Sequence, residues 1–416
     1  MTRLLKIFLT AWLAIVMLLM IIINVNVYRA PDSSVNGKKS LNVNLLKELA
    51  FLKESLDNGE DIAMQNLYPE GYVFINSLYG LAWCNTIAKL DPKDSLYQHG
   101  HIEIETAFAK IHSPTGREPF DETLPLPYGA FYNGWSNYLL GQKLMLARQI
   151  DRDTSEINQF KKTCAAIDLQ LKDKTYPASY YNGVWPADVT ICVASLRLHD
   201  KIFDAMYSKT ISDWSDQIKL SVDKNGLIPH EINPRDGSIT EEARGSSQSL
   251  MLIFLKEIDP DFASEQFKLY EKLFIDTRLG LTGIREYPKG TFGIGDVDSG
   301  PVIFQMGGAA TVVGMQTTGL FEKNEISSQI NATIEGLAFP VTTKKDQFYL
   351  FGTLPMVDGF IAWAHSNQKS TVKTSPSFLT FHLYSLTCAV LIGLLIWWLW
   401  RKPNQKVNWS SGGELT

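Results

Sequence analysis

The chain has 416 residues, of which 45% are hydrophobic, and a formal net charge of −5. Its length allows one large domain or two ordinary ones, and its weak acidity, without a long basic block, argues against a nucleic-acid-binding protein. The four cysteines show no CxxC pairing or other zinc-ligand spacing. We expect no metal site and no cofactor. For Cys84, Cys164 and Cys192 we expect ordinary buried thiols, with a disulfide between two of them as the alternative.

The first apolar segment covers residues 7–27, and about 20 such residues suffice to cross a bilayer. Arg3 and Lys6 precede it. A cleaved signal peptide is the competing interpretation, but it would have an apolar core of about 7 to 15 residues followed by a small-residue cleavage motif. The segment meets neither condition well, which favours a retained membrane anchor.

A second apolar span covers residues 378–400 and ends in a tryptophan-rich belt next to Arg401 and Lys402. Positive residues thus lie outside both spans. The positive-inside rule then places both termini in the cytoplasm and the body of the chain across the membrane. An exported domain without a cysteine framework is easier to reconcile with a bacterial envelope, so we expect a protein of the bacterial inner membrane.

The body begins with a polar linker over residues 28–43, and a helix that starts at Leu45 ends at Asn58-Gly59. Further helices are expected at residues 71–90, 95–111, 130–150, 156–171, 186–203, 204–222, 243–254, 261–274, 301–318 and 325–336. A strand pair is expected only around residues 226–228 and 237–239. Helices of roughly 12 to 20 residues with few strand candidates predict an all-α body.

The loops between these helices differ in character. Some are short, such as residues 151–156, whereas residues 174–187 and 279–300 form long loops, the first rich in aromatic residues and the second in glycine. Long functional loops on one face and short turns on the other are the expected layout of a helical toroid.

Three consecutive segments carry a family resemblance. A helix ends in DKNGL, a short ribbon reads PHEINPRDG, and EEARGSSQSL opens the next helix. This loop style resembles the (α/α)6 toroids of the six-hairpin glycosidase-like group and, distantly, the linalool dehydratase/isomerase-like proteins. The resemblance covers about residues 45–364 and concerns architecture alone. No catalytic motif matches, and Cys192 stands alone where a paired-cysteine motif would be needed, which counts against the same lyase chemistry.

The expected organisation is therefore an (α/α)-toroid flanked by two transmembrane helices. Its parts are a cytoplasmic N-terminus (1–6), a transmembrane helix (7–27), a linker (28–43), an extracytoplasmic toroid domain (44–368), a second linker (369–377), a second transmembrane helix (378–400) and a cytoplasmic tail (401–416).

The stretch from 279 to 315 draws attention because a glycine-rich run leads into an apolar segment of helical length. Polar groups at the mouth of a buried helix are what the floor of a pocket needs. The plainer alternative is that Asp298 or Ser299 caps a helix whose first turn contains Pro301. Arg285-Glu286 is either an internal ion pair or an anion clamp, and the sequence does not decide between them.

Carboxylates are the natural candidates for acid–base catalysis, because glycosidases use two carboxyl groups that flank the bond to be cleaved. The candidate catalytic residues are Asp188, Glu231, Glu286, Asp296 and Asp298. The candidate substrate-binding residues are Tyr132, Trp135, Tyr180, Tyr181, Trp185, His230, Arg244, Arg285, Tyr287 and Ser299. For Asp188 a capping role, and for each aromatic residue a core position, is the competing interpretation.

Two classes of function remain. One is a membrane-anchored extracytoplasmic hydrolase or lyase whose carboxylate pair acts on a carbohydrate or lipid-like substrate. The other is a non-catalytic, membrane-tethered ligand-binding or scaffold protein of the envelope. Carboxyl groups facing each other across an open cavity would favour the enzyme, whereas a filled core or arginine-bound carboxylates would favour the binding protein. The sequence leaves the substrate and the oligomeric state open.

Overall fold

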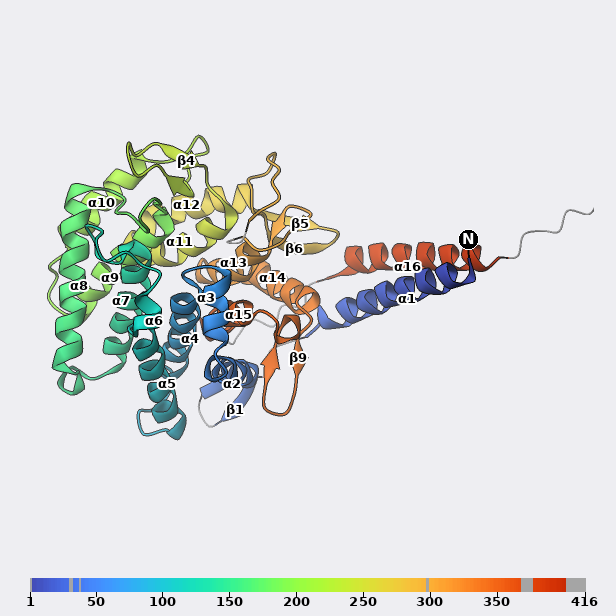
Figure 1. Ribbon diagram of the computed structural model, residues 1–416, viewed down its shortest axis with the longest axis horizontal. Helices are drawn as coiled ribbons and strands as arrows, with labels where there is room; N and C mark the ends of the chain where they lie inside the picture. The colour runs from blue at the N-terminus through green and yellow to red at the C-terminus, as the bar shows by residue number, and fades with distance from the viewer. Residues whose placement is uncertain (1, 30–32, 37–38, 297–298, 368–376, 402–416) are drawn as a thin grey trace, which may run out of the picture.

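The computed structural model describes residues 2–29, 33–36, 39–296, 299–367 and 377–401. Most of the expected linker at 369–377, most of the expected tail and the candidate Asp298 fall outside these ranges. Figure 1 shows a helical body from which two long helices extend together on one side.

Within the described residues, six helices form a closed inner ring in which each contacts the next and the last contacts the first. These inner helices are α4 (Gly71–Ile87), α7 (Gly129–Leu146), α9 (Pro186–Ile202), α11 (Gly245–Ile258), α13 (Gly308–Leu320) and α15 (Pro355–Asn367). An outer helix packs against each of them: α2 (Val43–Asp57), α5 (Ser95–Ile111), α8 (Thr154–Asp173), α10 (Ser208–Leu220), α12 (Pro260–Leu273) and α14 (Asn324–Leu337). The body is an (α/α)6 toroid, and the expected fold class is confirmed.

The inner helices are buried on nearly all sides, whereas the outer helices bury one face and expose the other. Nearly every residue of α4 is buried, and Gly80 lets it approach α7 so closely that an added Cβ would lie 2.9 Å from the side chain of Leu139. The outer helix α10 instead buries one face, which includes Ile211, Trp214 and Ile218. Cys84, Cys164 and Cys192 are free, buried thiols, as expected.

Most predicted helices are present, but one begins later than expected and three helices were not predicted. The helix expected at 301–318 begins only at Gly308, because the preceding residues form a hairpin of β7 (Val302–Ile303) and β8 (Met306–Gly307). Its turn holds Phe304 and Gln305 at φ 51° and 70°. The inner helix α15 and the short helices α3 (Glu60–Leu67) and α6 (Pro114–Arg117) were not predicted.

The expectation of a single strand pair was wrong. The hairpin β3 (Glu231–Ile232) with β4 (Ile239–Glu241) lies close to the predicted place. Additional antiparallel hairpins are β1 (Ser33–Asn36) with β2 (Lys39–Asn42), β5 (Ile275–Arg278) with β6 (Leu281–Ile284), β7 with β8, and β9 (Val341–Thr342) with β10 (Gln347–Phe348). The first of these lies in the segment expected to be a plain linker. These strands have at most four residues each, too few for a period-2 pattern to stand out.

The loops are distributed unequally over the two ends of the ring. Every connection from an outer helix to the next inner helix reaches the same end, which we call the loop end. The longest of these connections, residues 274–307, joins α12 to α13. At the other end the turns are short, and a single residue, Asp259, separates α11 from α12. The expected asymmetry is confirmed, and functional side chains should be sought at the loop end.

Aromatic side chains from the inner helices meet in the middle of the ring. The ring centroids of Trp135 and Phe74 are 4.7 Å apart, and those of Trp135 and Trp363 are 6.0 Å apart. Phe254 packs edge-on against Trp135 at 6.0 Å. Such edge-to-face contacts stabilise a core beyond the burial of apolar area. The middle of the ring is therefore packed with side chains.

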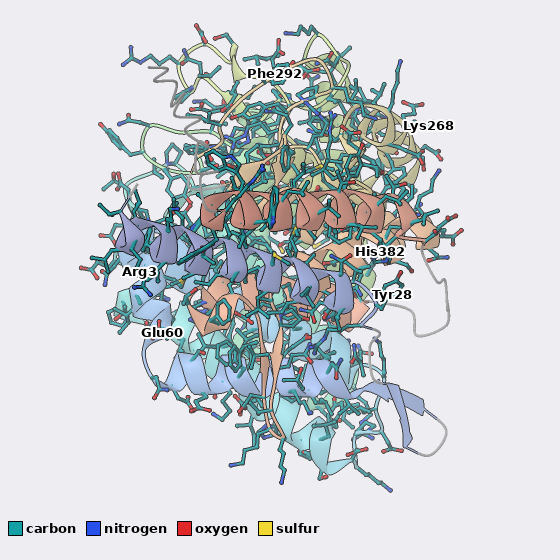
Figure 2. The ribbon with its side chains drawn as sticks, turned by 90° about the vertical axis from the view of Figure 1, so that its right-hand side faces the viewer. Arg3, Tyr28, Glu60, Lys268, Phe292 and His382 are labelled. Carbon is teal, nitrogen blue, oxygen red and sulfur yellow. The ribbon has the colours of Figure 1, made fainter. Side chains whose placement is uncertain are left out.

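The two extended helices, α1 (Arg3–Asn26) and α16 (Leu379–Trp400), are long and apolar enough to cross a membrane by length and composition. They lie against each other (Figure 1). His382 of α16 lies beside Tyr28, just after α1 (Figure 2). Its Nε2 is 2.6 Å from the hydroxyl of Tyr28, and its Nδ1 is 2.6 Å from Asn24 Oδ1. Polar contacts of this kind stabilise the pairing of helices in lipid.

Candidate functional site

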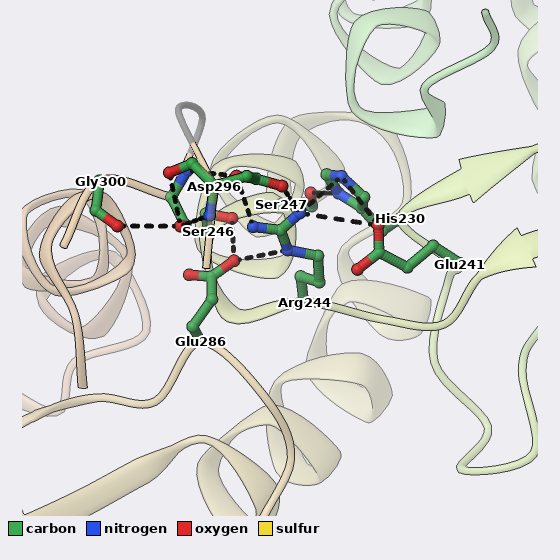
Figure 3. Close-up of polar contacts among 9 residues, drawn as sticks. His230, Glu241, Arg244, Ser246, Ser247, Glu286, Asp296 and Gly300 are labelled. Carbon is green, nitrogen blue, oxygen red and sulfur yellow. Dashed lines mark hydrogen bonds and ion pairs between the residues drawn. The ribbon is translucent and has the colours of Figure 1, made fainter. Parts of the chain in front are cut away.

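Polar side chains from two loop-end connections meet at the beginning of α11. The hairpin β3–β4 supplies His230 and Glu241, and Arg244 is the residue just before the helix. The connection from α12 to α13 supplies Glu286 and Asp296. We call this group, with its hydrogen-bonded serines, the Arg244 cluster. Its members are His230, Glu241, Arg244, Ser246, Ser247, Glu286, Asp296 and Ser299 (Figure 3).

The backbone fixes the cluster before any side chain contributes. The amide of Gly245 donates a hydrogen bond of 2.8 Å to the carbonyl of Glu286. A Cβ at Gly245 would lie 1.8 Å from the carbonyl oxygen of Arg285, so only glycine permits this approach. The amide of His230 donates to the carbonyl of Glu241 at 3.1 Å and holds those two side chains together.

Arg244 binds two carboxylates with different parts of its guanidinium group. Its Nε donates to Glu286 Oε1 at 2.8 Å. Its two terminal nitrogens donate to the two oxygens of Asp296, at 2.5 and 2.9 Å, in a bidentate pair. The guanidinium carbon also lies 5.6 Å from the centre of the Tyr287 ring. Burial acts to lower the pKa of Arg244, but its bonds to Asp296 and Glu286 outweigh burial and raise the pKa.

Glu286 is the interior partner of Arg244. Its side chain is 0% exposed, and Oε1 also accepts a hydrogen bond of 2.7 Å from Ser246. Among the described residues, none donates a hydrogen bond to Oε2. Burial is the main cause that raises the pKa of Glu286, and Arg244 opposes it. Because the Glu286 carboxyl group is enclosed, it cannot reach a substrate, and its role is to hold Arg244 in position.

Asp296 is the solvent-side partner of Arg244, with a side chain that is 49% exposed. Its Oδ1 accepts a hydrogen bond of 3.0 Å from the amide of Ser299, whose hydroxyl accepts one of 2.9 Å from the amide of Asp296. The hydrogen bonds from Arg244 lower the pKa of Asp296 to about 2. Ser299 thus closes a local turn and does not cap α13, whose N-cap is Gly307. The predicted capping role of Ser299 was wrong.

Glu241 and His230 form the remaining side of the cluster. Glu241 Oε2 lies 3.8 Å from His230 Nε2 and 3.6 Å from Arg244 Nη1. Burial raises the pKa of Glu241, whose side chain is still 38% exposed. Burial and the charge of Arg244 lower the pKa of His230 to about 3, so its imidazole is neutral at ordinary pH.

The hydrogen bonds of His230 indicate where its proton lies. Arg244 Nη1 lies 3.4 Å from Nε2 of His230. Because an arginine can only donate, Nε2 accepts, and Nδ1 carries the proton and donates to the hydroxyl of Ser247.

Glu241 was not among the predicted site residues. The signal that could have found it is the run EEAR, which places two carboxylates just before a buried arginine.

An aromatic wall adjoins the Arg244 cluster through the loop before α9. Tyr180 stacks on Phe120 with ring centroids 6.0 Å apart, and Trp185 packs edge-on against Tyr180 at 5.3 Å. Trp185 is half-buried. In the same loop, Val184 pairs with Ile232 of β3, two residues from His230. The structure therefore brings the predicted aromatic loop next to the hairpin β3–β4, which carries Glu241.

Other predicted binding residues lie elsewhere. Trp135 is fully buried in the middle of the ring, and the hydroxyl of buried Tyr132 accepts a hydrogen bond of 3.1 Å from Arg117. Tyr181 is 71% exposed. Arg285 does not pair with its neighbour Glu286 and instead contacts Asp276 at 3.3 Å. Of the two earlier alternatives, an ion pair within Arg285-Glu286 was wrong, and Arg285 is a buried structural residue.

The remaining candidate carboxylates are less informative. Asp188 is buried in the first turn of α9, where its backbone amide donates to the carbonyl of Trp185 at 3.0 Å. Glu231 begins β3, directly across from Glu241 in the hairpin. Catalytic roles for Asp188 and Glu231 stay predictions. Among the described residues, no group of three or more His, Cys, Asp or Glu side chains is placed to hold a metal ion.

The chain was compared with family models, curated proteins and solved structures. No family model and no curated protein matches the chain. Among solved structures, a GH76 α-mannanase from Bacteroides thetaiotaomicron is 12% identical, with a TM-score of 0.44, over 71% of this chain and 86% of its own. An unsaturated glucuronyl hydrolase specific for heparin is 9% identical, with a TM-score of 0.44, over 86% of this chain and 97% of its own. At such distance the helix packing, and not these matches, identifies the chain as an (α/α)6 toroid of the six-hairpin type.

Proposed function

We propose that this protein is a membrane-anchored hydrolase or lyase that uses acid–base catalysis at the Arg244 cluster on a saccharide. Glu241 is the proton-transferring group, and Arg244 holds the carboxylates of the cluster in place around it. Trp185, whose ring packs edge-on against Tyr180, would supply an apolar ring of the kind on which sugar rings stack.

The observation that carries this proposal is the position of Glu241. Its carboxyl group is partly exposed, has a raised pKa, and lies within 4 Å of both a buried arginine and a neutral imidazole. A raised pKa suits a carboxyl group to act as an acid, because the group keeps its proton to a higher pH than a free glutamate does. Asp296, with a pKa of about 2, is too weak a base for this role.

The membrane part of the proposal rests on the two terminal helices. We propose that α1 and α16 both cross the bacterial inner membrane, so that both termini lie in the cytoplasm and the toroid lies outside. Reporter fusions at each terminus and in the exposed turn at Asp236 test this topology in cells. Cytoplasmic signal at both ends and an extracytoplasmic signal at Asp236 are expected.

The catalytic proposal is tested with the purified full chain in detergent. The chain is incubated with a panel of neutral and acidic oligosaccharides, and the products are followed by new reducing ends and by the absorbance of unsaturated sugars. Cleavage that is absent in Glu241→Gln, and retained in the neighbouring Glu242→Gln, supports the proposal. Cleavage that survives equally in both variants refutes the role of Glu241.

A binding protein is the second candidate, and two observations favour it. The middle of the ring is filled by aromatic side chains such as Trp135, and the carboxylates of Glu286 and Asp296 are held by Arg244. Such a protein would bind a saccharide at the same loop end and leave it unchanged. Binding without cleavage in the assay above would identify this alternative.

A further inference from the structure

The two carboxylates on Arg244 are not equivalent. Glu286 is wholly buried, whereas half of the Asp296 side chain faces solvent. The Arg244 side chain is 1% exposed, and Asp296 occupies both of its terminal nitrogens. A ligand that arrives from solvent therefore meets the Asp296 carboxylate where it would otherwise meet the arginine fork.

A buried guanidinium needs a partner at all times, because an unpaired buried charge is strongly destabilising. Glu286 engages Nε and leaves the terminal fork to a second anion. Planar, two-point contact is the geometry by which arginine recognises a carboxylate. The two terminal nitrogens of Arg244 are thus placed to bind a carboxylate, and in the free protein this carboxylate is that of Asp296.

We propose that Arg244 is the binding site for a carboxylate of the substrate and that Asp296 occupies this site in its absence. The inference rests on the proposed function, since it assigns the saccharide to the acidic class, such as uronic acids. Exchange of one carboxylate for another keeps the charge and the two hydrogen bonds of Arg244 unchanged. The exchange therefore leaves no buried charge unpaired.

The surroundings of the fork fit this role. Glu241 lies 3.6 Å from Arg244 Nη1, so a sugar whose carboxylate replaced that of Asp296 would lie against the proton-transferring group. Tyr287, whose ring the guanidinium faces at 5.6 Å, restricts the fork from one side. Arg244, Glu241 and the Tyr287 ring would then all contact the same acidic sugar unit.

The test measures binding by calorimetry with the full chain in detergent, using glucuronate, glucose and inorganic phosphate as probes. Asp296→Asn keeps the size of the side chain and removes its charge, which frees the fork. We expect this variant to bind glucuronate about tenfold more tightly than the wild type, because the internal competitor is weakened. Glucose binding should not change.

Asp236→Asn is the matched control, since Asp236 is an exposed carboxylate in the turn between β3 and β4 that accepts hydrogen bonds from Ser238 of the same turn. It should leave glucuronate binding at the wild-type level. In the double variant Asp296→Asn with Arg244→Lys, the gain should disappear, because lysine has no planar fork. Thermal unfolding verifies that each variant is folded.

The outcomes separate this inference from the proposed function. Tighter glucuronate binding without any cleavage activity would keep the carboxylate site and refute the enzyme. Cleavage of neutral saccharides, with no gain of glucuronate affinity in Asp296→Asn, would keep the enzyme and overturn the site. A gain for phosphate in place of glucuronate would also overturn the assignment to a carboxylate.

Discussion

Arg244 donates a hydrogen bond of 2.8 Å from Nε to Glu286, and this ion pair is fully enclosed, with side chains 1% and 0% exposed. The two residues come from different loop-end connections, one before α11 and one before α13. The pair therefore ties together two neighbouring hairpins of the toroid at the point where the candidate site lies.

Removal of Glu286 should destabilise the protein strongly. Glu286→Ala removes the buried partner of the guanidinium and leaves it with the more exposed carboxylates of Asp296 and Glu241, and loss of one member of a buried pair typically costs about 3–5 kcal/mol. Denaturant unfolding of the full chain measures the change. Glu271→Ala serves as the control, because Glu271 forms a partly exposed ion pair with Lys323 and should cost about 1 kcal/mol or less. Equal effects of the two substitutions would contradict the structural role of Glu286.

His230 should make the folded state sensitive to acid. Its pKa is about 3 in the folded protein and near 6.5 when exposed. Between these values the unfolded state binds more protons, so the free energy of unfolding falls as the pH falls, by at most about 1.4 kcal/mol per pH unit. The difference between wild type and His230→Gln, measured from pH 7 to pH 3, isolates this contribution.

The exposed pair of His101 with Glu105 provides a control for the acid titration. His101→Gln should leave the pH dependence of unfolding close to that of the wild type, since surface pairs contribute little. A His230→Gln variant with the same slope as the wild type would show that His230 is not held neutral.

Trp185 should contribute to substrate affinity. Trp185→Ala removes a half-buried ring from the aromatic wall, and aromatic contacts of this kind are worth about 0.5–1.5 kcal/mol. We expect KM for a cleaved saccharide to rise about tenfold while kcat changes little, because a stacking surface binds the ground state and the transition state alike. Phe351→Ala, which removes an exposed ring before α15, is the control. A fall in kcat without a change in KM would argue against a binding role for Trp185.

Local sequence patterns predicted the two apolar spans and most helices, because these depend on composition and on spacing along the chain. The inner helix α15 escaped prediction because Pro355, Asp358 and Gly359 interrupt its apolar pattern near its start. The helix predicted from Pro301 begins at Gly308, because Phe304 and Gln305 adopt left-handed conformations that the sequence does not signal.

The candidate site was only partly predictable. Arg244, Glu286 and Asp296 were recognised individually as polar residues of the long loops, but closure of the toroid, not local sequence, brings them together. Arg244 and Asp296 are 52 positions apart. Glu241 was overlooked because a carboxylate in a polar run resembles a solvated one until its neighbours are known.

The most direct test of the account is the pH dependence of kcat/KM for a cleaved saccharide. If Glu241 in its protonated form donates the proton, activity should fall as the pH rises through a pKa above the ordinary value for glutamate, since burial raises it. Glu241→Gln should lower the rate by about 10²–10⁴-fold and abolish this alkaline limb. An unchanged limb in Glu241→Gln would contradict the assignment of Glu241 as the catalytic acid.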